Sequence, residues 1–228
     1  MDYQLGGGSP PADGVGIVVR DGTDEPAAGV YSVCYLNGFQ TQPGADWPDE
    51  LVLHDASGAE VFDPGWPDER ILDISTAARR EGIAAQLEPA VAACRDDGFQ
   101  AVEFDNLDSY TRSGDRLDLE DAVAFATRLV QRATAAGLEA GQKNTPQLGA
   151  RGPEIGFTFA VTEECARYRE CGEYTAVYGQ RVIDIEYADD LDRTFEEICA
   201  DPETPASTIL RDRSLATPDD PGYVYEHC

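Results

Sequence analysis

Acidic side chains stand at the ends of several short apolar runs, and the clearest case is VEFDNLDSY, Val102 to Tyr110. In an extended strand Glu103 and Asp105 share one face. A carboxylate that points into a protein interior needs a partner or a function, because burying an unpaired charge is unfavourable. We therefore expect these acids to belong to a reactive site. The alternative is that Asp105 and Asp108 only cap the turn that follows the strand.

The second cluster is GQKN, Gly141 to Asn144, which contains the only lysine of the chain. Lys143 stands at the end of an apolar run. Apart from the two histidines, all other basic side chains of the protein are arginines. A surface ion pair is the alternative role, but a chain that otherwise uses arginine would use arginine there as well. We expect Lys143 to be a point-charge donor in the same site as the acids.

Two further runs end in acids. In AVTEEC, Ala160 to Cys165, the neighbours Glu163 and Glu164 would face opposite sides of a strand, so only one of them can face a site. In VIDIEY, Val182 to Tyr187, the same alternation places Asp184 and Glu186 on one face. Each acid alone is unremarkable in so acidic a chain, but their repeated position at the ends of apolar runs indicates one shared site.

Carboxylates from several strand ends, together with one lysine, suggest glycoside hydrolysis. This reaction needs one carboxyl group to protonate the leaving oxygen and another to attack the sugar or to activate water. The two histidines, His54 and His227, fall in an expected loop and tail and are not catalytic candidates. No G-x-S-x-G motif of a serine hydrolase occurs. A metal-assisted hydrolase with Asp73, Asp105 and Glu186 as oxygen ligands stays open as an alternative.

The elements that must position these residues are short strands that alternate with alanine-rich helices. The predicted helices are Thr76–Asp96, Leu119–Ala136 and Leu191–Ala200, and the predicted strands are Tyr3–Leu5, Val15–Val19, Val30–Leu36, Ile71–Ile74, Ala101–Phe104, Leu138–Gln142, Phe157–Thr162, Val182–Tyr187 and Thr208–Leu210. This alternation predicts a parallel sheet, and the carboxyl ends of parallel strands meet at one rim. The absence of a glycine-rich phosphate loop favours an α/β fold of the (β/α)8 TIM-barrel type. The barrel should be irregular near the N-terminus, because the stretch between Val19 and Val30 is too short for a crossover helix. We expect one domain over residues 1–228.

Composition limits the partners of the protein. The chain has 17 Lys and Arg against 44 Asp and Glu, a net charge of -27, which excludes nucleic acid and anionic membranes as partners. No apolar run approaches the roughly 20 residues of a membrane span. Six cysteines without zinc-ligand spacing indicate disulfides, for which 15 pairings are possible, and hence a secreted or extracytoplasmic protein. Met1 to Leu5 has no features of a cleavable signal, so we expect a mature chain.

Motifs along nearly the whole chain resemble glycoside hydrolase family 114, the endo-α-1,4-polygalactosaminidases. The motifs that carry the resemblance are Val33-Cys34-Tyr35, Trp66 to Glu69 followed by Leu72-Asp73-Ile74, Val102 to Tyr110, Lys143-Asn144, Phe159 to Cys165 with Glu170-Cys171, Glu186-Tyr187, and Ile209 to Asp212.

The resemblance implies a (β/α)8-type barrel that cleaves internal α-1,4 bonds of a galactosamine-containing polysaccharide. It implies Asp105 as the nucleophile and Glu163 as the acid/base, without a cofactor. The positions that match the family's pocket lining are Tyr35, Asp73, Asn106, Asp108, Lys143, Asn144, Glu186 and Tyr187. Phe104 replaces the usual proline and Glu164 a common glutamine, and these departures bear on the preferred substrate more than on the reaction class.

We expect a monomer that acts by a retaining mechanism on a polysaccharide, and a cationic, deacetylated substrate would suit the net charge of -27. The main alternative is a carbohydrate-binding barrel that has lost its activity.

Overall fold

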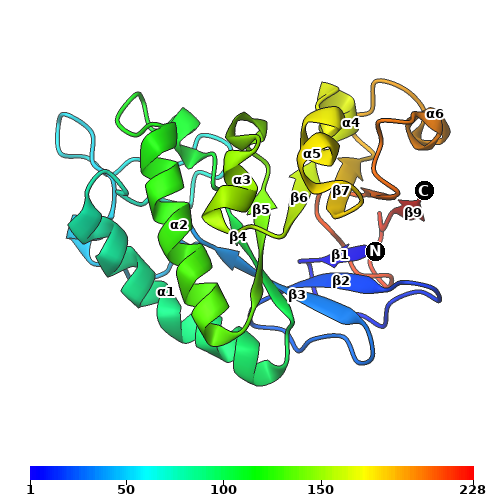
Figure 1. Cartoon of the computed structure of the whole chain (residues 1–228), viewed down its shortest axis with the longest axis horizontal. Coiled ribbons are helices and arrows are strands. Elements are labelled where there is room, and N and C mark those ends of the chain that lie inside the picture. The colour runs from blue at the N-terminus through cyan, green and yellow to red at the C-terminus, as the bar shows by residue number, and fades with distance from the viewer.

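The computed structural model describes residues 1–228 and shows a nine-stranded sheet in the order β1 to β9 (Figure 1). The first eight strands are parallel and follow the order of the chain, and only β9 is antiparallel to its neighbour β8. The strands are β1 (Asp2–Gln4), β2 (Ile17–Asp21), β3 (Tyr31–Asn37), β4 (Ala101–Asp105), β5 (Glu139–Lys143), β6 (Phe159–Glu163), β7 (Val182–Tyr187), β8 (Ser207–Arg211) and β9 (Tyr225–His227).

Helices follow the strands only from β3 onward. They are α1 (Ala77–Asp97), α2 (Leu119–Ala136), α3 (Arg151–Ile155), α4 (Cys165–Tyr168), α5 (Cys171–Tyr178) and α6 (Phe195–Ala200), with 3-10 turns η1 (Asp49–Leu51), η2 (Ser109–Arg112) and η3 (Pro146–Leu148). The two long helices, α1 and α2, lie side by side on one side of the sheet (Figure 1). The connections after β1 and β2 contain no helix, which confirms the predicted irregularity near the N-terminus.

Local sequence explains where α2 begins and ends. Asp118 accepts a hydrogen bond from the backbone amide of Asp121, and the Asp121 side chain accepts one from the amide of Asp118, a reciprocal capping box. Gly137 ends the helix with φ of 86°, a left-handed conformation that glycine adopts without a steric penalty. The sequence predicted the bounds of α2 correctly for this reason.

The prediction of a barrel strand at Ile71–Ile74 is wrong. This run makes antiparallel bridges inside the β3–α1 connection, where Ile71 pairs with Gln40 and Leu72 with Val52. Ile71, Leu72 and Ile74 are fully buried in the cluster that also receives α1 and α2. Their apolar character therefore reflects packing beneath the long connection and not membership of the barrel sheet. Strand β9 and the short helices α3 to α5 were not predicted.

The sheet curls into a TIM-type barrel that stays open at one seam. The two edge strands are β1 and β9, so no backbone ladder joins β1 to β8. The buried guanidinium of Arg211, at the end of β8, spans this seam. It donates to the Asp2 carboxylate at 3.0 Å and to the backbone oxygen of Tyr3 in β1, and it also donates to the backbone oxygen of Val224 at 3.0 Å. The predicted α/β barrel is confirmed. Side-chain contacts of Arg211 join β8 to β1 in place of a backbone ladder.

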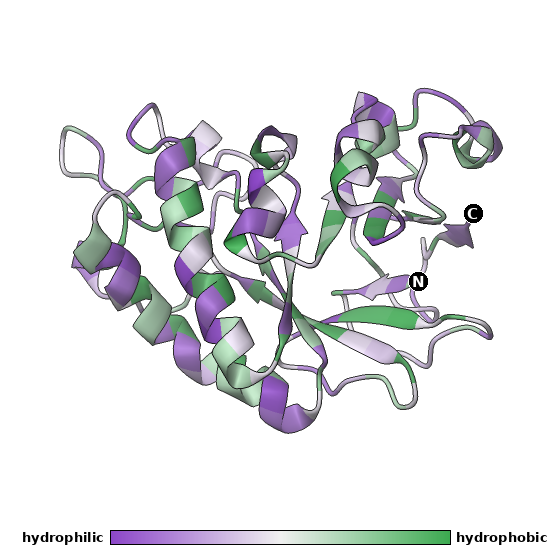
Figure 2. Cartoon of the chain, in the orientation of Figure 1, coloured by the Kyte–Doolittle hydropathy of each residue, from purple (hydrophilic) through white to green (hydrophobic).

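Apolar side chains divide into three packed clusters. The largest lies between the sheet and helices α1 and α2, and another packs under α4, α5 and α6. The third fills the barrel with alternate strand residues, among them Val19, Val33, Val161, Ile183 and Ile185. In Figure 2 the strand β2 is largely apolar, whereas α1 and α2 carry alternating hydrophilic and apolar bands. Burial on both faces of the sheet therefore holds the strand ends in fixed positions.

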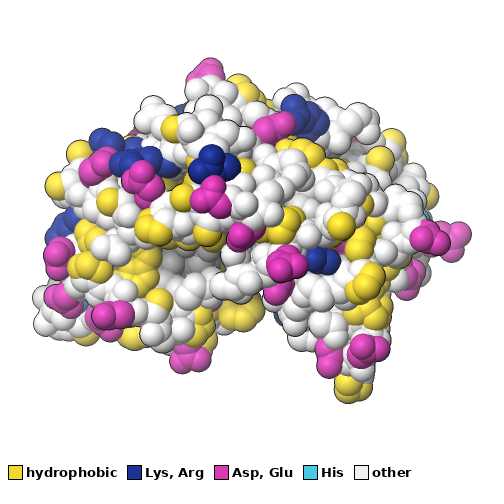
Figure 3. Space-filling model, turned by 90° about the horizontal axis from the view of Figure 1, so that it is seen from below, with side chains coloured by type: hydrophobic (Ala, Val, Ile, Leu, Met, Phe, Trp, Pro, Cys, Tyr) yellow, Lys and Arg dark blue, Asp and Glu magenta, His cyan; other side chains and the backbone are white.

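Three disulfides use all six cysteines: Cys34–Cys94 joins β3 to α1, Cys165–Cys171 joins α4 to α5, and Cys199–Cys228 fastens the C-terminal strand to α6. The prediction of disulfides is confirmed. No helix is both long and apolar enough to span a membrane. Carboxylates are spread over the surface seen in Figure 3, several of them beside the few cationic groups.

Candidate active site

A pocket of about 620 Å³ opens at the carboxyl ends of the parallel strands. Most residues predicted from the sequence to form the site line it, namely Tyr35, Asp105, Asn106, Asp108, Lys143, Asn144, Glu163 and Tyr187. They come from β3, β4, β5, β6 and β7 and from the residues that directly follow these strands. The expectation that strand ends bring distant acids to one rim is thus met for these positions.

Lys143 is at the centre of the pocket floor. Its side chain is 2% exposed, and its Nζ lies 2.8 Å from a Glu103 oxygen, 3.1 Å from Asp105 Oδ1 and 3.3 Å from Glu163 Oε2. Nζ also donates to the hydroxyl of Tyr3 at 3.2 Å, and this hydroxyl donates to Glu103 at 2.9 Å. One buried cation therefore holds three carboxylates from β4 and β6 together.

Two tyrosines hold the outer sides of the carboxylates. The Tyr35 hydroxyl donates to Asp105 Oδ2 at 2.5 Å, and the Tyr187 hydroxyl donates to Glu163 Oε1 at 2.5 Å. Asn144 donates through its side-chain amide to Glu163 Oε2 at 3.3 Å and accepts the Glu163 backbone N–H at 2.8 Å. The carboxylates of Asp105 and Glu163 are thus each fixed by Lys143 on one side and by a phenol on the other.

Burial and charge set the protonation of this cluster. Burial would raise the pKa of Asp105, but the charge of Lys143 and the hydrogen bond from Tyr35 outweigh burial and hold this pKa below its ordinary value. Burial raises the pKa of Glu103, whose second oxygen is buried without a hydrogen-bond partner. Burial would lower the pKa of Lys143, yet the surrounding carboxylates raise it well above its ordinary value. At neutral pH Asp105 is an anion beside a cation.

The backbone turns sharply just after each of these strands. Asn106, Asn144 and Glu164 follow Asp105, Lys143 and Glu163, and they have φ of 65°, 43° and 61°. Left-handed backbone is uncommon outside glycine and costs about 1–3 kcal/mol where it is strained. The turn at Glu164 sends its carboxylate away from Glu163, to Arg213 at 2.8 Å. The expectation that only one of these two glutamates faces the pocket is met.

Two predicted positions lie elsewhere. Asp73 accepts hydrogen bonds from the backbone N–H and the hydroxyl of Ser75 and pairs with Arg79 at 3.0 Å, so it supports the start of α1. Glu186 accepts the backbone N–H of Ala166 at 2.7 Å, on the side of β7 that faces α4. Asp73, Asp105 and Glu186 therefore do not share a site, and the metal-assisted alternative has no common ligand set in this structure.

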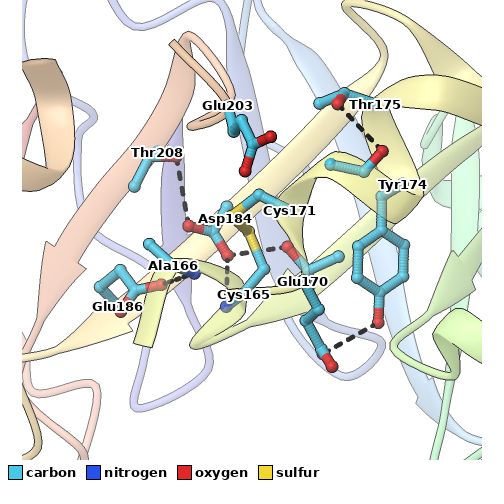
Figure 4. The surroundings of a disulfide bond; sticks show 12 residues. Cys165, Ala166, Glu170, Cys171, Tyr174, Thr175, Asp184, Glu186, Glu203 and Thr208 are labelled. Atoms are coloured by element: carbon cyan, nitrogen blue, oxygen red, sulfur yellow. Dashed lines mark hydrogen bonds between the residues drawn. A yellow bond between two sulfur atoms is a disulfide. The ribbon is translucent and has the colours of Figure 1, made fainter. Parts of the chain in front are cut away.

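Figure 4 shows where the Asp184 and Glu186 pair lies, beside the disulfide Cys165–Cys171. Asp184 accepts the backbone N–H of Cys165 at 3.2 Å and the hydroxyl of Thr208 at 3.2 Å. Burial raises the pKa of both carboxyl groups. The sequence predicted correctly that they share a face, but it is the outer face of the barrel, because Ile183, Ile185 and Tyr187 take the inner one.

Several lining residues were not recognised from the sequence as site residues. Arg112 pairs with Asp63 and, at 2.9 Å, with Asp108. Arg213 lies over the ring of Tyr187, 4.4 Å from its centroid. Others that line the pocket without having been assigned to it are Tyr3, Asp21, Gln42, Trp66 and Glu69. Most come from the long loops around the barrel, where no period in the sequence shows which way a side chain points.

The arrangement is suited to two-carboxylate chemistry. Asp105 Oδ1 and Glu163 Oε2 each contact the same ammonium group, so these two oxygens cannot be farther apart than the sum of 3.1 Å and 3.3 Å. Asp49, His54 and Glu60 form a separate, partly exposed group of possible metal ligands outside the pocket.

Comparison with known proteins agrees with this architecture. The sequence profile of glycoside-hydrolase family GH114 matches residues 1–228. The crystal structure of Aspergillus fumigatus Ega3 in complex with galactosamine is similar with a TM-score of 0.79 and 22% identity, over 100% of this chain and 94% of that chain. The glycoside hydrolase domain of PelA from Pseudomonas aeruginosa is similar with a TM-score of 0.59 and 15% identity, over 95% of this chain and 96% of that chain. No curated protein sequence matches at a significant level.

The two structural similarities, at these identities, concern the fold. The family match covers every strand and every residue of the pocket, and it confirms the predicted family and the predicted glycosidase class. The chain belongs to glycoside-hydrolase family GH114 and is a glycoside hydrolase.

Proposed function

We propose that the protein is an endo-acting enzyme that cleaves internal α-1,4 bonds of a galactosamine-containing polysaccharide. The observation that carries this proposal is the single ammonium group of Lys143 between Asp105 and Glu163 in an open pocket. A neighbouring cavity of about 510 Å³ shares Asp21, Tyr35 and Gln42 with the pocket. Two adjoining cavities suit a substrate longer than a single sugar unit.

In the proposed mechanism the Asp105 carboxylate attacks the anomeric carbon while the Glu163 carboxyl group gives its proton to the departing glycosidic oxygen. The glycosyl–Asp105 ester then reacts with water, whose proton passes to the Glu163 carboxylate, and the sugar leaves with retained configuration. The low pKa of Asp105 supports its role as the anionic nucleophile. The shared contact with Lys143 keeps the two carboxylates close together, as a retaining mechanism requires.

Galactosamine is supported as the sugar by the charge of the chain and by the galactosamine bound to Ega3. A deacetylated polymer is cationic, and a net charge of -27 would attract it over long distances at low salt. We further propose that residues 1–228 act as one domain and as a monomer. The three disulfides support function in an oxidising, extracytoplasmic compartment.

The test is product analysis on a defined α-1,4-linked galactosamine polymer. We expect internal cleavage, seen by mass spectrometry as a range of shortened oligosaccharides early in the reaction. Proton NMR should show the α-anomer as the first product, because two inversions retain configuration. Asp105→Asn is the control that should abolish cleavage. A first product in the β-configuration would overturn the retaining mechanism, and an intact polymer would overturn the substrate and favour the non-catalytic binding barrel.

A further inference from the structure

A tight loop from Asp63 to Glu69, called here the 63–69 loop, forms one wall of the pocket. The backbone N–H of Asp63 donates to the Glu69 oxygen at 2.9 Å, and the N–H of Glu69 donates to the Trp66 oxygen at 2.9 Å. The Asp63 carboxylate also accepts the backbone N–H of Gly65 at 2.7 Å. Trp66 and Glu69 both line the pocket. These internal bonds hold the loop in one conformation, so its side chains are in place before a substrate binds.

Two acids of the pocket, Glu69 and Asp21, have no cationic partner within salt-bridge distance. Asp63 and Asp108 pair with Arg112, while Asp105 and Glu163 pair with Lys143. No basic group lies within 4.0 Å of Glu69. The Asp21 carboxylate accepts hydrogen bonds from the backbone N–H and the hydroxyl of Thr23 in an exposed turn.

The surroundings of Glu69 make its negative charge costly without a ligand. The side chain is half-buried, and its carboxylate accepts one hydrogen bond, from the Asn37 side-chain amide at 2.9 Å. Burial raises the pKa of Glu69, the charges of Asp105 and Asp63 add to this, and the hydrogen bond from Asn37 and the more distant charge of Arg112 offset it only in part. Asn37 also accepts a hydrogen bond at 3.1 Å from the side-chain amide of Asn106, which directly follows Asp105. This chain of contacts places Glu69 beside the reacting centre.

Trp66 adds an aromatic surface to the same loop. It is 60% exposed and is one of only three large hydrophobic side chains with such exposure. An indole face attracts an ammonium group more strongly than other aromatic rings do, and it also packs against sugar C–H groups. A large aromatic ring exposed to water in the same pocket as an unneutralised carboxylate is a combination that suits a cationic, ring-shaped ligand.

We propose that the 63–69 loop is the subsite that binds the protonated 2-amino group of a galactosamine unit, with Glu69 as ion-pair acceptor and Trp66 as the packing surface. This inference rests on the proposed function and goes further, because it names the residues that distinguish a deacetylated from an acetylated sugar. An N-acetyl group has no charge and is larger, so it would leave Glu69 without a counter-charge. Glu69 is here a specificity-determining residue and takes no part in bond cleavage.

The test compares Glu69→Gln with the wild type on two oligosaccharides of equal length, one fully deacetylated and one fully N-acetylated. Glutamine keeps the shape and the hydrogen bond from Asn37 but removes the charge. We expect kcat/KM on the deacetylated substrate to fall about 10- to 100-fold, through KM, because a charged hydrogen bond is lost. On the acetylated substrate the change should stay below about threefold. Glu50→Gln removes an exposed charge of η1, outside the 63–69 loop and the pocket, and is the matched control, expected to leave both activities unchanged.

A binding experiment separates this inference from the proposed function. Galactosamine is titrated calorimetrically into Asp105→Asn and into the same variant carrying Glu69→Gln or Trp66→Ala. Binding that is lost with either second substitution supports the subsite even if the wild type cleaves no polymer. Equal affinity in all three proteins, or an equal loss of kcat/KM on both oligosaccharides, would overturn the subsite while leaving a measured cleavage activity intact.

Discussion

Lys143→Met removes the charge that holds the pocket together while keeping a side chain of similar length. At the observed distance of 3.1 Å and an effective dielectric constant of about 20, each contact with a carboxylate is worth about 5 kcal/mol before desolvation is counted. Desolvation offsets much of this, and breaking a buried ion pair costs about 3–5 kcal/mol. For a protein of this size each kcal/mol corresponds to about 2–4 °C, so we expect Tm to fall by roughly 6–20 °C at neutral pH.

The pH dependence of this loss follows from the carboxylates. In the wild type Lys143 holds the pKa of Asp105 low, so this contribution to stability is present above about pH 4 and is lost as the pH falls through the folded-state pKa. In Lys143→Met the buried carboxylates lose their counter-charge, and protonation at acid pH relieves them. The difference in unfolding free energy between the two proteins should therefore be largest near pH 7 and should shrink progressively as the pH falls towards and below about pH 4. The acid limb of kcat/KM should also move to higher pH.

Chemical denaturation between about pH 3 and pH 7 measures the stability difference, and a kcat/KM profile over the same range measures the limb. Arg181→Met is the control, because the exposed pair of Arg181 with Glu139 should contribute no more than about 1 kcal/mol. A loss below about 1 kcal/mol for Lys143→Met at pH 7, or a loss that does not depend on pH, would refute the view that Lys143 neutralises this cluster.

Other predictions concern single groups. Glu163→Gln should lower kcat about 10²- to 10⁴-fold on polymer while the protein stays folded, measured by initial rates and circular dichroism, and unchanged kcat would exclude Glu163 as the acid/base. Cys34→Ala with Cys94→Ala should lower the unfolding free energy by about 4 kcal/mol, because the bond closes a loop with a sequence separation of 60, and an unchanged denaturation midpoint would contradict this. Burial raises the pKa of Glu186 to about 8 from 4.5, so the folded protein retains a proton that the unfolded chain has lost. The wild type should therefore lose stability relative to Glu186→Gln as the pH rises between these values, by up to about 1.4 kcal/mol per pH unit in denaturation curves, and a constant difference would count against it.

The strands and the central residues of the pocket could be predicted because their signals are local. Short β-branched runs mark β4 and β7, and strict alternation places Glu103 and Asp105 on one face. A parallel sheet then brings the carboxyl ends of its strands to one rim without further information. A lone lysine at such an end was an additional, compositional signal that pointed to Lys143.

The remaining features depend on contacts that are distant along the chain. Ile71 to Ile74 has the apolar pattern of a strand, but it pairs antiparallel within a connection, a choice set by packing beneath α1. Alternation placed Asp184 and Glu186 together but could not say that their face points outward. Glu69 and Arg213 lie on loops, where no regular period fixes the direction of a side chain. The structure was needed to show that these two reach the pocket.

The burial of Lys143 has a practical consequence for chemical labelling. Because it is the only lysine and is 2% exposed, reagents that acylate primary amines find no accessible side-chain target on the folded protein. A molecule whose core has opened would be acylated at Lys143, and mass spectrometry would detect it by the added mass of one acyl group. The chain thus carries its own footprinting probe, placed by its fold at the point where three strand ends converge.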